Sequence, residues 1–331
     1  HQIHELSPSL IFCDSNHRHR LKGDDIVQMD ENFFLNSFTF DIRRLKLPDP
    51  DKIDQDEVFG YFFTSGTSGF PKIVPLKRRQ MIAAAESSAK NFKPEPNHFW
   101  LQCLPLNHVG GITIILRSLI YKTAVYRMNV FHEEMIKEFL SQNTQFQAAS
   151  LVPTMLKRLL DDPLFRTHHK FKAILMGGGP SNENLLRRAA ERGIPLVSSY
   201  GMTETCAQIV ANSMHIPSGT YTPIKSVGKP FPPNQLEIRD QSGKKLGMNE
   251  SGTIWLKGPQ VFDGYYQSDA QPFDEDGWFN TGDFGHLNGF GLLFIESRRT
   301  DIIITGGENV NPAIVESAME QVPEIEEAVV I

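Results

Sequence analysis

KAILMGGGPSNENLLRRAAERGIPLVSSYGMTET, residues 172–205, is the stretch that decides the fold. It contains two short apolar runs of the kind found in buried strands, at residues 172–176 and 194–199. Between them, Ser181 can cap a helix with one apolar face, and Gly193 stands just past the last turn of that helix. Two strands joined by a helix pair in parallel, because a parallel connection needs such a crossover. The stretch therefore predicts one unit of a parallel, helix-covered sheet.

The same alternation is present nearer the N-terminus. Strand candidates and amphipathic helix candidates follow one another at residues 101–105, 124–126, 132–142, 147–152 and 153–161. The last of these helices begins with proline, which is favoured in a first turn. We therefore expect an α/β fold with a large N-terminal domain of mostly parallel sheets covered by helices.

After about residue 215 the pattern changes to short strands separated by turn pairs such as Asp276-Gly277 and Asn288-Gly289. Turns of this kind join antiparallel strands, so a smaller, barrel-like β subdomain is expected. Its strand candidates are residues 236–239, 253–257 and 292–296. Beyond it, a strand at 302–305, a helix at 312–319 and a strand starting near Ala328 indicate the beginning of a small α+β C-terminal domain.

Composition places the chain among globular proteins. The 331 residues are 40% hydrophobic and 22% charged, with a formal net charge of −6, so neither disorder nor binding to nucleic acid is expected. No apolar run approaches the ~20 residues needed to cross a bilayer, so we expect no membrane span. The cysteines Cys13, Cys103 and Cys206 form no CxxC pair, which favours a reducing compartment. These features predict a cytoplasmic protein, and they leave a homo-oligomer open.

The segment TSGTSGFPK, residues 64–72, lies between a strand expected at 58–64 and a helix expected after Leu76. Its glycines let backbone N–H groups converge, its hydroxyls add donors, and Lys72 adds a positive charge, a combination that suits a polyphosphate. A Walker A loop, and with it a phosphate-loop NTPase or kinase, does not fit, because Ile73 follows the lysine and the glycine spacing differs. Taken alone, the loop could also be a flexible surface segment.

Two further segments carry polar groups suited to a nucleotide. In SSYGMTET, residues 198–205, Tyr200 offers a flat face to a base, and Glu204 offers a hard oxygen ligand to Mg²⁺. This segment follows a parallel-type strand, at the sheet edge where ligands bind. In Thr281-Gly282-Asp283 the carboxylate can accept hydrogen bonds from ribose hydroxyls. The alternatives are an exposed acid in an ordinary turn for Glu204 and a turn acid for Asp283.

Five motifs occur in order along the chain: TSGTSGFPK, GGG at 177–179, YGMTET, TGD, and a segment from SRRTD to GGEN at 297–309. Together they resemble the adenylate-forming superfamily of acyl-CoA synthetases, luciferases and peptide-synthetase adenylation domains. The segments 104–126, 149–160, 175–186 and 199–210 are most similar to o-succinylbenzoate–CoA ligases. The resemblance implies an AMP-forming acid–thiol ligase of menaquinone biosynthesis that uses ATP, CoA and a small carboxylic acid, with Mg²⁺ as cofactor.

The resemblance also implies a nucleotide site. Lys72, Thr203 and Glu204 would be catalytic: Lys72 would hold the β- and γ-phosphates, Thr203 would face phosphate, and Glu204 would hold Mg²⁺. Asp283 and Arg298 would bind the ribose hydroxyls. The full set implied for ATP and AMP is Thr64, Ser65, Gly66, Thr67, Ser68, Gly69, Lys72, Gly177, Gly178, Gly179, Ser199, Tyr200, Gly201, Thr203, Asp283 and Arg298.

On the acid side the resemblance and the residues point to His108, Arg117 and Gly178. His108 matches a family histidine beside the acyl and thiol channel and would be catalytic, although an isolated histidine in an apolar stretch can also be a satisfied core residue. Arg117 lies in an otherwise apolar segment, where an unpaired guanidinium is costly to bury. We hypothesise that it binds the non-reacting carboxylate of a dicarboxylic aromatic acid. The alternative is an arginine that reaches along the surface to water.

The chain departs from the family pattern at a few positions. Ser297 replaces the usual glycine before the ribose arginine, Thr300 occupies a hinge position where Asp or Lys is usual, and Asn107 replaces an aromatic residue before His108. These departures concern hinge behaviour and pocket shape rather than ATP binding.

We expect residues 1–297 to form the AMP-binding domain, short at its N-terminal end, and residues 298–331 to form the hinge and first elements of a truncated C-terminal domain. The resemblance implies that full-length relatives carry, in the later part of this C-terminal domain, the lysine that bridges the α-phosphate and the carboxylate. Residues 298–331 do not include that lysine motif. We therefore expect this chain to bind nucleotide and to adenylate weakly. An acyl- or aryl-CoA synthetase of other specificity and a non-catalytic nucleotide-binding relative remain as alternatives.

Overall fold

The computed structural model describes residues 11–13, 26–28, 53–64, 72–96, 98–128, 130–179, 183–213, 225–298, 303–305 and 308–310, with isolated positions between 315 and 330. The chain divides into two compact units, His1–Ile53 and Asp54–Ile331. In the first unit β1 (Ile11–Cys13) pairs in parallel with β2 (Ile26–Gln28). The expected site residues all belong to the second unit.

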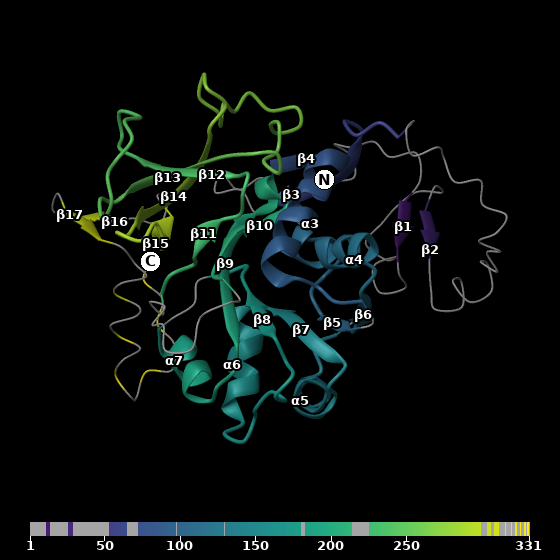
Figure 1. Cartoon of the computed structure of the whole chain (residues 1–331). Coiled ribbons are helices and arrows are strands. Elements are labelled where there is room, and N and C mark those ends of the chain that lie inside the picture. Colours follow the sequence, from purple (N-terminus) through teal and green to yellow (C-terminus); the bar gives the residue numbers. More distant parts are fainter. Residues whose placement is uncertain are drawn as a thin grey trace. The chain divides into compact units, whose positions relative to one another are not determined.

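The second unit contains a seven-stranded sheet of order β11-β10-β9-β8-β7-β5-β6 (Figure 1). Neighbours from β6 to β9 are parallel, whereas β10 runs antiparallel to both β9 and β11. The strands are β5 (Phe99–Gln102), β6 (Ala124–Arg127), β7 (Phe146–Leu151), β8 (Ala173–Met176), β9 (Leu196–Met202), β10 (Ala207–Ala211) and β11 (Lys229–Pro230).

Alternate residues of the parallel strands enter two different cores, because successive side chains of a strand point to opposite faces. Leu101 and Ile174 pack with the helices α5, α6 and α7, and their neighbours Trp100 and Ala173 belong to the core that contains residues of α3 and α4. The helices are α3 (Arg78–Phe92), α4 (Val109–Tyr121), α5 (Glu133–Gln142), α6 (Pro153–Asp161) and α7 (Glu183–Glu191). The expected helix-covered α/β sheet is confirmed.

The sequence-based boundaries are close to those observed. The helix expected at 153–161 has those bounds as α6, and the strand expected at 58–64 has those bounds as β3. Strand β9 continues to Met202, so Tyr200 and Gly201 lie on the strand rather than after it, and residues 203–205 of the motif follow it. Strand β5 begins at Phe99 and already ends at Gln102, short of Pro105, a residue with no N–H to donate to a ladder.

A third core lies where a hairpin and an antiparallel sheet pack with elements already described. The hairpin of β3 (Val58–Thr64) and β4 (Lys72–Lys77), helix α3, strand β10 and a four-stranded antiparallel sheet all contribute buried residues to it. That sheet has the order β12-β13-β14-β15, with β12 (Gln235–Arg239), β13 (Gly252–Lys257), β14 (Phe279–Leu287) and β15 (Leu293–Arg298). The antiparallel strands expected after residue 215 are therefore confirmed.

Strands β16 (Ile303–Thr305) and β17 (Glu308–Val310) form a further antiparallel pair, which agrees with the strand expected at 302–305. Most of the helix expected at 312–319 lies outside the described residues, as does Thr300. Within the described part of the chain, no helix is both long and apolar enough to cross a membrane.

Candidate functional site

Strands β3 and β4 bring together the two ends of the expected phosphate loop. Thr64, the last residue of β3, pairs with Lys72, the first residue of β4. Val74 and Leu76 anchor β4 because both are fully buried. The lysine therefore extends from a well-packed strand. The loop residues between the two strands, Ser65, Gly66, Thr67, Ser68 and Gly69, lie outside the described residues.

The acid of the expected magnesium motif is buried. Residues Thr203–Thr205 form a short 3-10 turn, η4, between β9 and β10, and Glu204 is only 7% exposed. Its backbone carbonyl accepts a hydrogen bond from the N–H of Phe262 over 2.8 Å. Its side-chain Oε1 accepts another from the hydroxyl of Tyr265 over 2.9 Å. The alternative of an exposed acid in an ordinary turn is therefore wrong, because the turn is covered by the chain around residues 262–265.

The ring of Tyr265 also meets the phosphate-loop lysine. The Nζ atom of Lys72 lies over this ring, 4.6 Å from its centroid. A cation in this position is attracted by the negative face of the ring. One tyrosine thus contacts both of the charged residues that the sequence assigns to the phosphates and the metal.

The tyrosine of the YGMTET motif reaches the aspartate of the TGD motif. The hydroxyl of Tyr200 donates to Oδ2 of Asp283 over 2.7 Å. Asp283 lies within strand β14, opposite Arg298 of β15 in the ladder, and its own N–H donates to Oγ1 of Thr281. The alternative that Asp283 is a turn acid is wrong, because the TGD motif is part of a strand. The two residues expected at the ribose are therefore ladder partners.

Glycines of the same region allow close backbone approach. A Cβ at Gly201 would lie 2.0 Å from the carbonyl oxygen of Ala207 on the neighbouring strand, so no larger residue fits. At Gly177 a Cβ would lie 2.9 Å from Oγ of Ser199, whose hydroxyl donates to the Met176 carbonyl over 2.9 Å. Gly178 has a φ of 78°, a conformation that glycine adopts readily. Gly179 follows these residues in the same bend between β8 and α7.

His108 and Arg117 lie on one helix, α4. His108 is the N-cap residue, is exposed, and makes no side-chain hydrogen bond to the first turn. The alternative of a satisfied core histidine is therefore wrong. His108 lies at the carboxyl end of β5, the edge of a parallel sheet where ligands bind.

Arg117 is only 4% exposed, which excludes the surface alternative. Its Nη1 donates to Oγ of Ser88 over 2.7 Å, and its Cζ lies 3.9 Å from the ring centroid of Trp100. Its Nη2 is buried and has no hydrogen-bond partner in the described part of the chain. Burial lowers the pKa of this guanidinium to about 9. Ser88 also accepts a hydrogen bond from Nε2 of Gln208 on β10, so the arginine belongs to a buried polar cluster.

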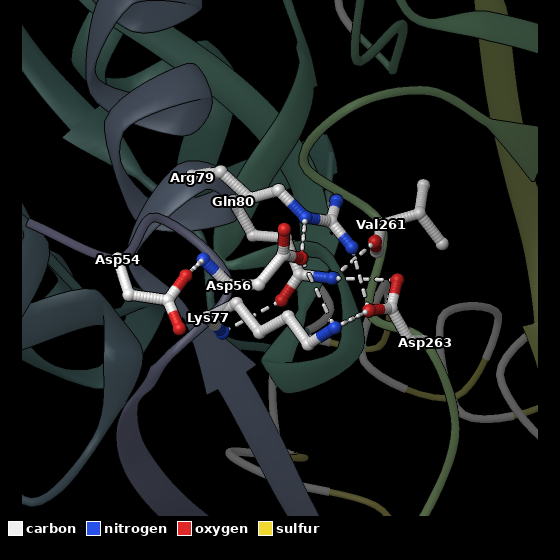
Figure 2. A network of polar contacts seen from close by, with 7 residues as sticks. All are labelled: Asp54, Asp56, Lys77, Arg79, Gln80, Val261 and Asp263. Atoms are coloured by element: carbon white, nitrogen blue, oxygen red, sulfur yellow. Dashed lines mark hydrogen bonds and ion pairs between the residues drawn. The ribbon is translucent and has the colours of Figure 1, made fainter.

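A network of ion pairs fixes the segment that carries Tyr265 (Figure 2). Oδ2 of Asp263 lies 2.9 Å from Nζ of Lys77 and 2.6 Å from Nη2 of Arg79. Asp56 contacts the same two cations, at 3.2 Å and 2.8 Å, and this holds the pKa of its carboxyl below its usual value. Gln80 donates both to Oδ1 of Asp263 and to the carbonyl of Val261. The start of α3 is thereby connected to the chain just before Tyr265.

The expected nucleotide-site residues therefore form two sets of contacts, in which Tyr265 contacts Lys72 and Glu204, and Tyr200 donates to Asp283. A comparison with known protein families agrees with a nucleotide site. Residues 1–266 match the model of the family described as AMP-binding enzyme. The chain belongs to the AMP-binding enzyme family.

Individual relatives of this AMP-binding enzyme point to one branch of the family. It is 36% identical to the 2-succinylbenzoate–CoA ligase of Oceanobacillus iheyensis, across 98% of this chain and 68% of that protein. It is 38% identical to the enzyme of the same name from Geobacillus kaustophilus, across 83% of this chain and 56% of the relative. The predicted resemblance to o-succinylbenzoate–CoA ligases is confirmed.

Solved structures give the same result. The o-succinylbenzoate coenzyme A synthetase of Bacillus subtilis in complex with AMP has a TM-score of 0.84 and 30% identity, and the match covers 99% of this chain and 66% of that chain. The AMP-binding enzyme described here thus spans between about half and two thirds of the length of such relatives.

The described residues suit a magnesium ion that arrives with a nucleotide. They contain no group of three or more histidine, cysteine, aspartate or glutamate side chains able to hold a metal by themselves. Mg²⁺ is commonly bound by one or two carboxylates together with substrate phosphates and water. Glu204 fits that pattern, because its Oε1 is held by Tyr265 and no described residue donates to its Oε2.

Sequence reasoning missed Tyr265 and Asp263. Neither belongs to the motifs that were recognised, and their partners lie 61 and 184 residues away along the chain. Cys206, two residues after Glu204, is buried, and burial raises the pKa of its thiol. A buried cysteine of this kind behaves as a small apolar side chain in the core.

Proposed function

We propose that this AMP-binding enzyme is an ATP-dependent carboxylate–CoA ligase that acts on o-succinylbenzoate. In the first step a carboxylate oxygen of the acid attacks the α-phosphorus of ATP, and the bond to pyrophosphate breaks. In the second step the thiol of CoA attacks the acyl carbon, loses its proton, and releases AMP. The names of the relatives and the geometry of the site both support this assignment.

One observation carries the proposal: motifs distant in the sequence are joined by direct side-chain contacts. Tyr200 is bonded to Asp283, and Tyr265 contacts both Lys72 and Glu204. The proposed base-binding face and ribose acceptor meet in the first of these contacts, and the proposed phosphate-binding cation and metal-binding acid share Tyr265 in the second. This is the set of groups that a transfer at the α-phosphate requires.

The roles proposed for the nucleotide-binding residues come from their places in the family motifs. Lys72, with Thr64 and the loop between them, would bind the β- and γ-phosphates, and Thr203 would face the phosphates from the turn beside Glu204. Tyr200, Ser199, Gly201 and the glycines at 177–179 would lie along the base, and Asp283 with Arg298 would hold the ribose. Mg²⁺, when bound, supplies positive charge that neutralises the departing pyrophosphate. The Bacillus subtilis relative has been solved with ATP and magnesium, at 31% identity.

Arg117 supports the choice of a diacid. A guanidinium that is buried with no anion among its described neighbours costs several kcal/mol relative to water. A ligand carboxylate beside Nη2 would offset that cost. We assign Arg117 to the carboxylate of the acid that does not react, and His108, at the exposed N-terminus of the same helix, to the acyl and thiol channel near Gly178.

The domain organisation belongs to the same proposal. Residues 1–297 would form the AMP-binding domain, and residues 298–331 would carry the hinge at Thr300 and the first elements of the C-terminal domain. The proposed reaction takes place where CoA and ATP are available, in the cytoplasm.

The proposal is tested by presenting the protein with ATP, Mg²⁺, CoA and one acid at a time. We expect thioester formation, followed by mass spectrometry, to be strongest with o-succinylbenzoate, weaker with benzoate and weakest with a medium-chain fatty acid. Binding of a non-reactive o-succinylbenzoyl-adenylate analogue, measured by calorimetry, gives a readout that needs no turnover. Preference for a fatty acid in both assays would favour an acyl-CoA synthetase of other specificity. Binding of ATP without any response to acids would favour a non-catalytic relative.

A further inference from the structure

Tyr265 contacts two side chains of opposite charge. The ammonium group of Lys72 sits over its ring at 4.6 Å, and its hydroxyl donates to Oε1 of Glu204 over 2.9 Å. Within the described part of the chain, the ammonium of Lys72 contacts the ring of Tyr265, and Oε1 of Glu204 contacts its hydroxyl, instead of pairing with each other. A lysine and a buried carboxylate that share a neighbour would attract each other strongly if nothing stood between them.

The position of Tyr265 is fixed by the backbone on both sides. The N–H of Phe262 donates to the carbonyl of Glu204 over 2.8 Å, and the N–H of Tyr266 donates to the carbonyl of Ile73 over 2.9 Å. The segment of residues 262–266 is therefore hydrogen-bonded to Glu204 at one end and to Ile73, the residue after Lys72, at the other. The ring of Tyr265 also packs edge-on against Phe262, with centroids 4.8 Å apart.

The same segment is held from outside by Asp263. Its carboxylate pairs with Lys77 and Arg79 at the start of α3 (Figure 2). Lys77 and Arg79 each form ion pairs with both Asp263 and Asp56. The hydroxyl of Tyr265 is therefore presented to Glu204 by a segment with three independent attachments.

A direct pair between Lys72 and Glu204 would impair both proposed roles. The lysine must give its charge to phosphate oxygens, and the carboxylate must give an oxygen to Mg²⁺. Each would first have to break the pair, so nucleotide binding would weaken. A cation over an aromatic ring is held less firmly than one in an ion pair and is more readily transferred to a phosphate. The hydroxyl occupies only Oε1 of Glu204, and Oε2 is left for the metal.

We propose that Tyr265 is a positioning residue that keeps Lys72 and Glu204 apart until the nucleotide and its metal bind. The inference rests on the proposed function, because it assumes that Lys72 meets phosphate and Glu204 meets Mg²⁺. It adds a residue that is neither a phosphate nor a metal ligand and that keeps the side chains of Lys72 and Glu204 from pairing with each other.

The decisive test uses ATP without metal. Under this condition the affinity depends on Lys72, the proposed phosphate-binding cation, and not on metal binding by Glu204. A fluorescent ATP analogue is titrated in EDTA into the protein and into Tyr265→Leu, Glu204→Gln and the double variant. Tyr265→Leu removes the ring and the hydroxyl, so Lys72 pairs with Glu204, and we expect the Kd for metal-free ATP to rise about tenfold. In the double variant the pair cannot form, and we expect the Kd to return to within about threefold of the unaltered protein.

Tyr266→Phe is the matched control. It removes a hydroxyl from the adjacent tyrosine, whose side chain contacts Gln267 and the ring of Tyr61, and we expect it to leave the Kd unchanged. An unchanged Kd in Tyr265→Leu would overturn the inference. So would a raised Kd that Glu204→Gln does not restore, since that result indicates general damage to the site. Failure of the unaltered protein to bind ATP would instead overturn the proposed function.

If Tyr265→Leu does not fold, as judged by thermal melting, Tyr265→Phe replaces it. This variant keeps the ring over Lys72 and loses only the bond to Glu204. We expect the Mg²⁺ concentration for half-maximal binding of the ATP analogue to rise about threefold, with no change in metal-free binding. The same Mg²⁺ requirement in Tyr265→Phe and Tyr266→Phe would contradict the role of the hydroxyl.

Discussion

The hydroxyl of Tyr200 on β9 donates to Oδ2 of Asp283 on β14 over 2.7 Å, although 83 residues separate them in the sequence. The contact joins the seven-stranded sheet to the four-stranded antiparallel sheet. It also places the acceptor proposed for the ribose beside the ring proposed for the base. A nucleoside bound there would contact both sheets at once.

Removing the Tyr200 hydroxyl is expected to weaken nucleoside binding without unfolding the protein. In Tyr200→Phe the ring remains and the bond to Asp283 is lost, so AMP affinity should fall about three- to tenfold, because the carboxylate proposed for the ribose loses the hydroxyl that positions it. Calorimetric titration with AMP measures this directly. Asp283→Asn should weaken AMP more, because it also removes the charge that the ribose hydroxyls meet.

The matching comparison uses 2′,3′-dideoxy-AMP, which lacks both ribose hydroxyls. Asp283→Asn should bind this analogue as well as the unaltered protein does. An equal loss of affinity for both nucleotides would show that Asp283 acts only on the fold.

Arg117 is expected to select for a second carboxylate. Arg117→Met keeps an unbranched stem in place of the arginine stem and removes the guanidinium with its charge, so affinity for o-succinylbenzoate should fall at least about tenfold. The folded, unliganded protein should stay within about 1 kcal/mol of its original stability, because the lost contacts are offset by relief from burying an unpaired cation. Acid binding is measured in the presence of a non-hydrolysable ATP analogue, and stability by urea unfolding.

The control for Arg117 is a ligand rather than a variant. 4-Oxo-4-phenylbutanoate has the reacting chain of o-succinylbenzoate and lacks the carboxylate on the ring. Arg117→Met should bind it no more weakly than the unaltered protein does. If both acids lost affinity equally, Arg117 would not be the partner of the second carboxylate.

Asp274 is expected to stabilise the four-stranded sheet only above acidic pH. Burial raises the pKa of its carboxyl, but the hydrogen bonds from Arg239 at 2.6 Å and from the N–H of Trp278 outweigh burial and lower the pKa below its ordinary value. A carboxyl with a depressed pKa in the folded state contributes stability above its unfolded pKa, and that contribution is lost as pH falls through the folded value.

Asp274→Asn should therefore lower the free energy of unfolding by about 1–3 kcal/mol at pH 7. The difference from the unaltered protein should shrink as pH falls below about 4, the ordinary pKa of aspartate. Urea titrations at a series of pH values measure it. Asp269→Asn, at an exposed position, serves as the matched control and should cost nothing at any pH. A loss that stays constant with pH would rule out the charge as its cause.

The sequence predicts the fold class because the information is local. Alternation of short apolar runs with amphipathic helices is visible within windows such as residues 147–161, and α6 has the bounds that its leading proline and apolar spacing predict. Tyr200, Glu204 and Asp283 were found in the same way, since each belongs to a compact motif. Their surroundings were less predictable. Whether Glu204 is exposed depends on the segment around Tyr265, which lies 61 residues away.

Arg117 shows where local reasoning stops. Its apolar neighbours in the sequence allow either a buried arginine or one that reaches the surface, because helix α4 is apolar over most of its circumference. The structure decides between them through Ser88 of α3 and Trp100 of β5, which cover the face that carries Arg117. Side-chain partners of this kind are fixed by tertiary packing and leave no periodic signal in the sequence.

Helix α4 has a consequence for how such a protein can change its substrate. It carries His108 at its start and Arg117 two turns later, and none of the residues assigned to the nucleotide belongs to it. The groups proposed for ATP lie instead on the β3–β4 hairpin, in the glycine bend after β8, on strand β9 with the adjoining turn η4, and on strands β14 and β15. Exchanging residues 108–121 between homologues should therefore transfer the preference for an acid and leave the residues proposed for ATP binding unchanged.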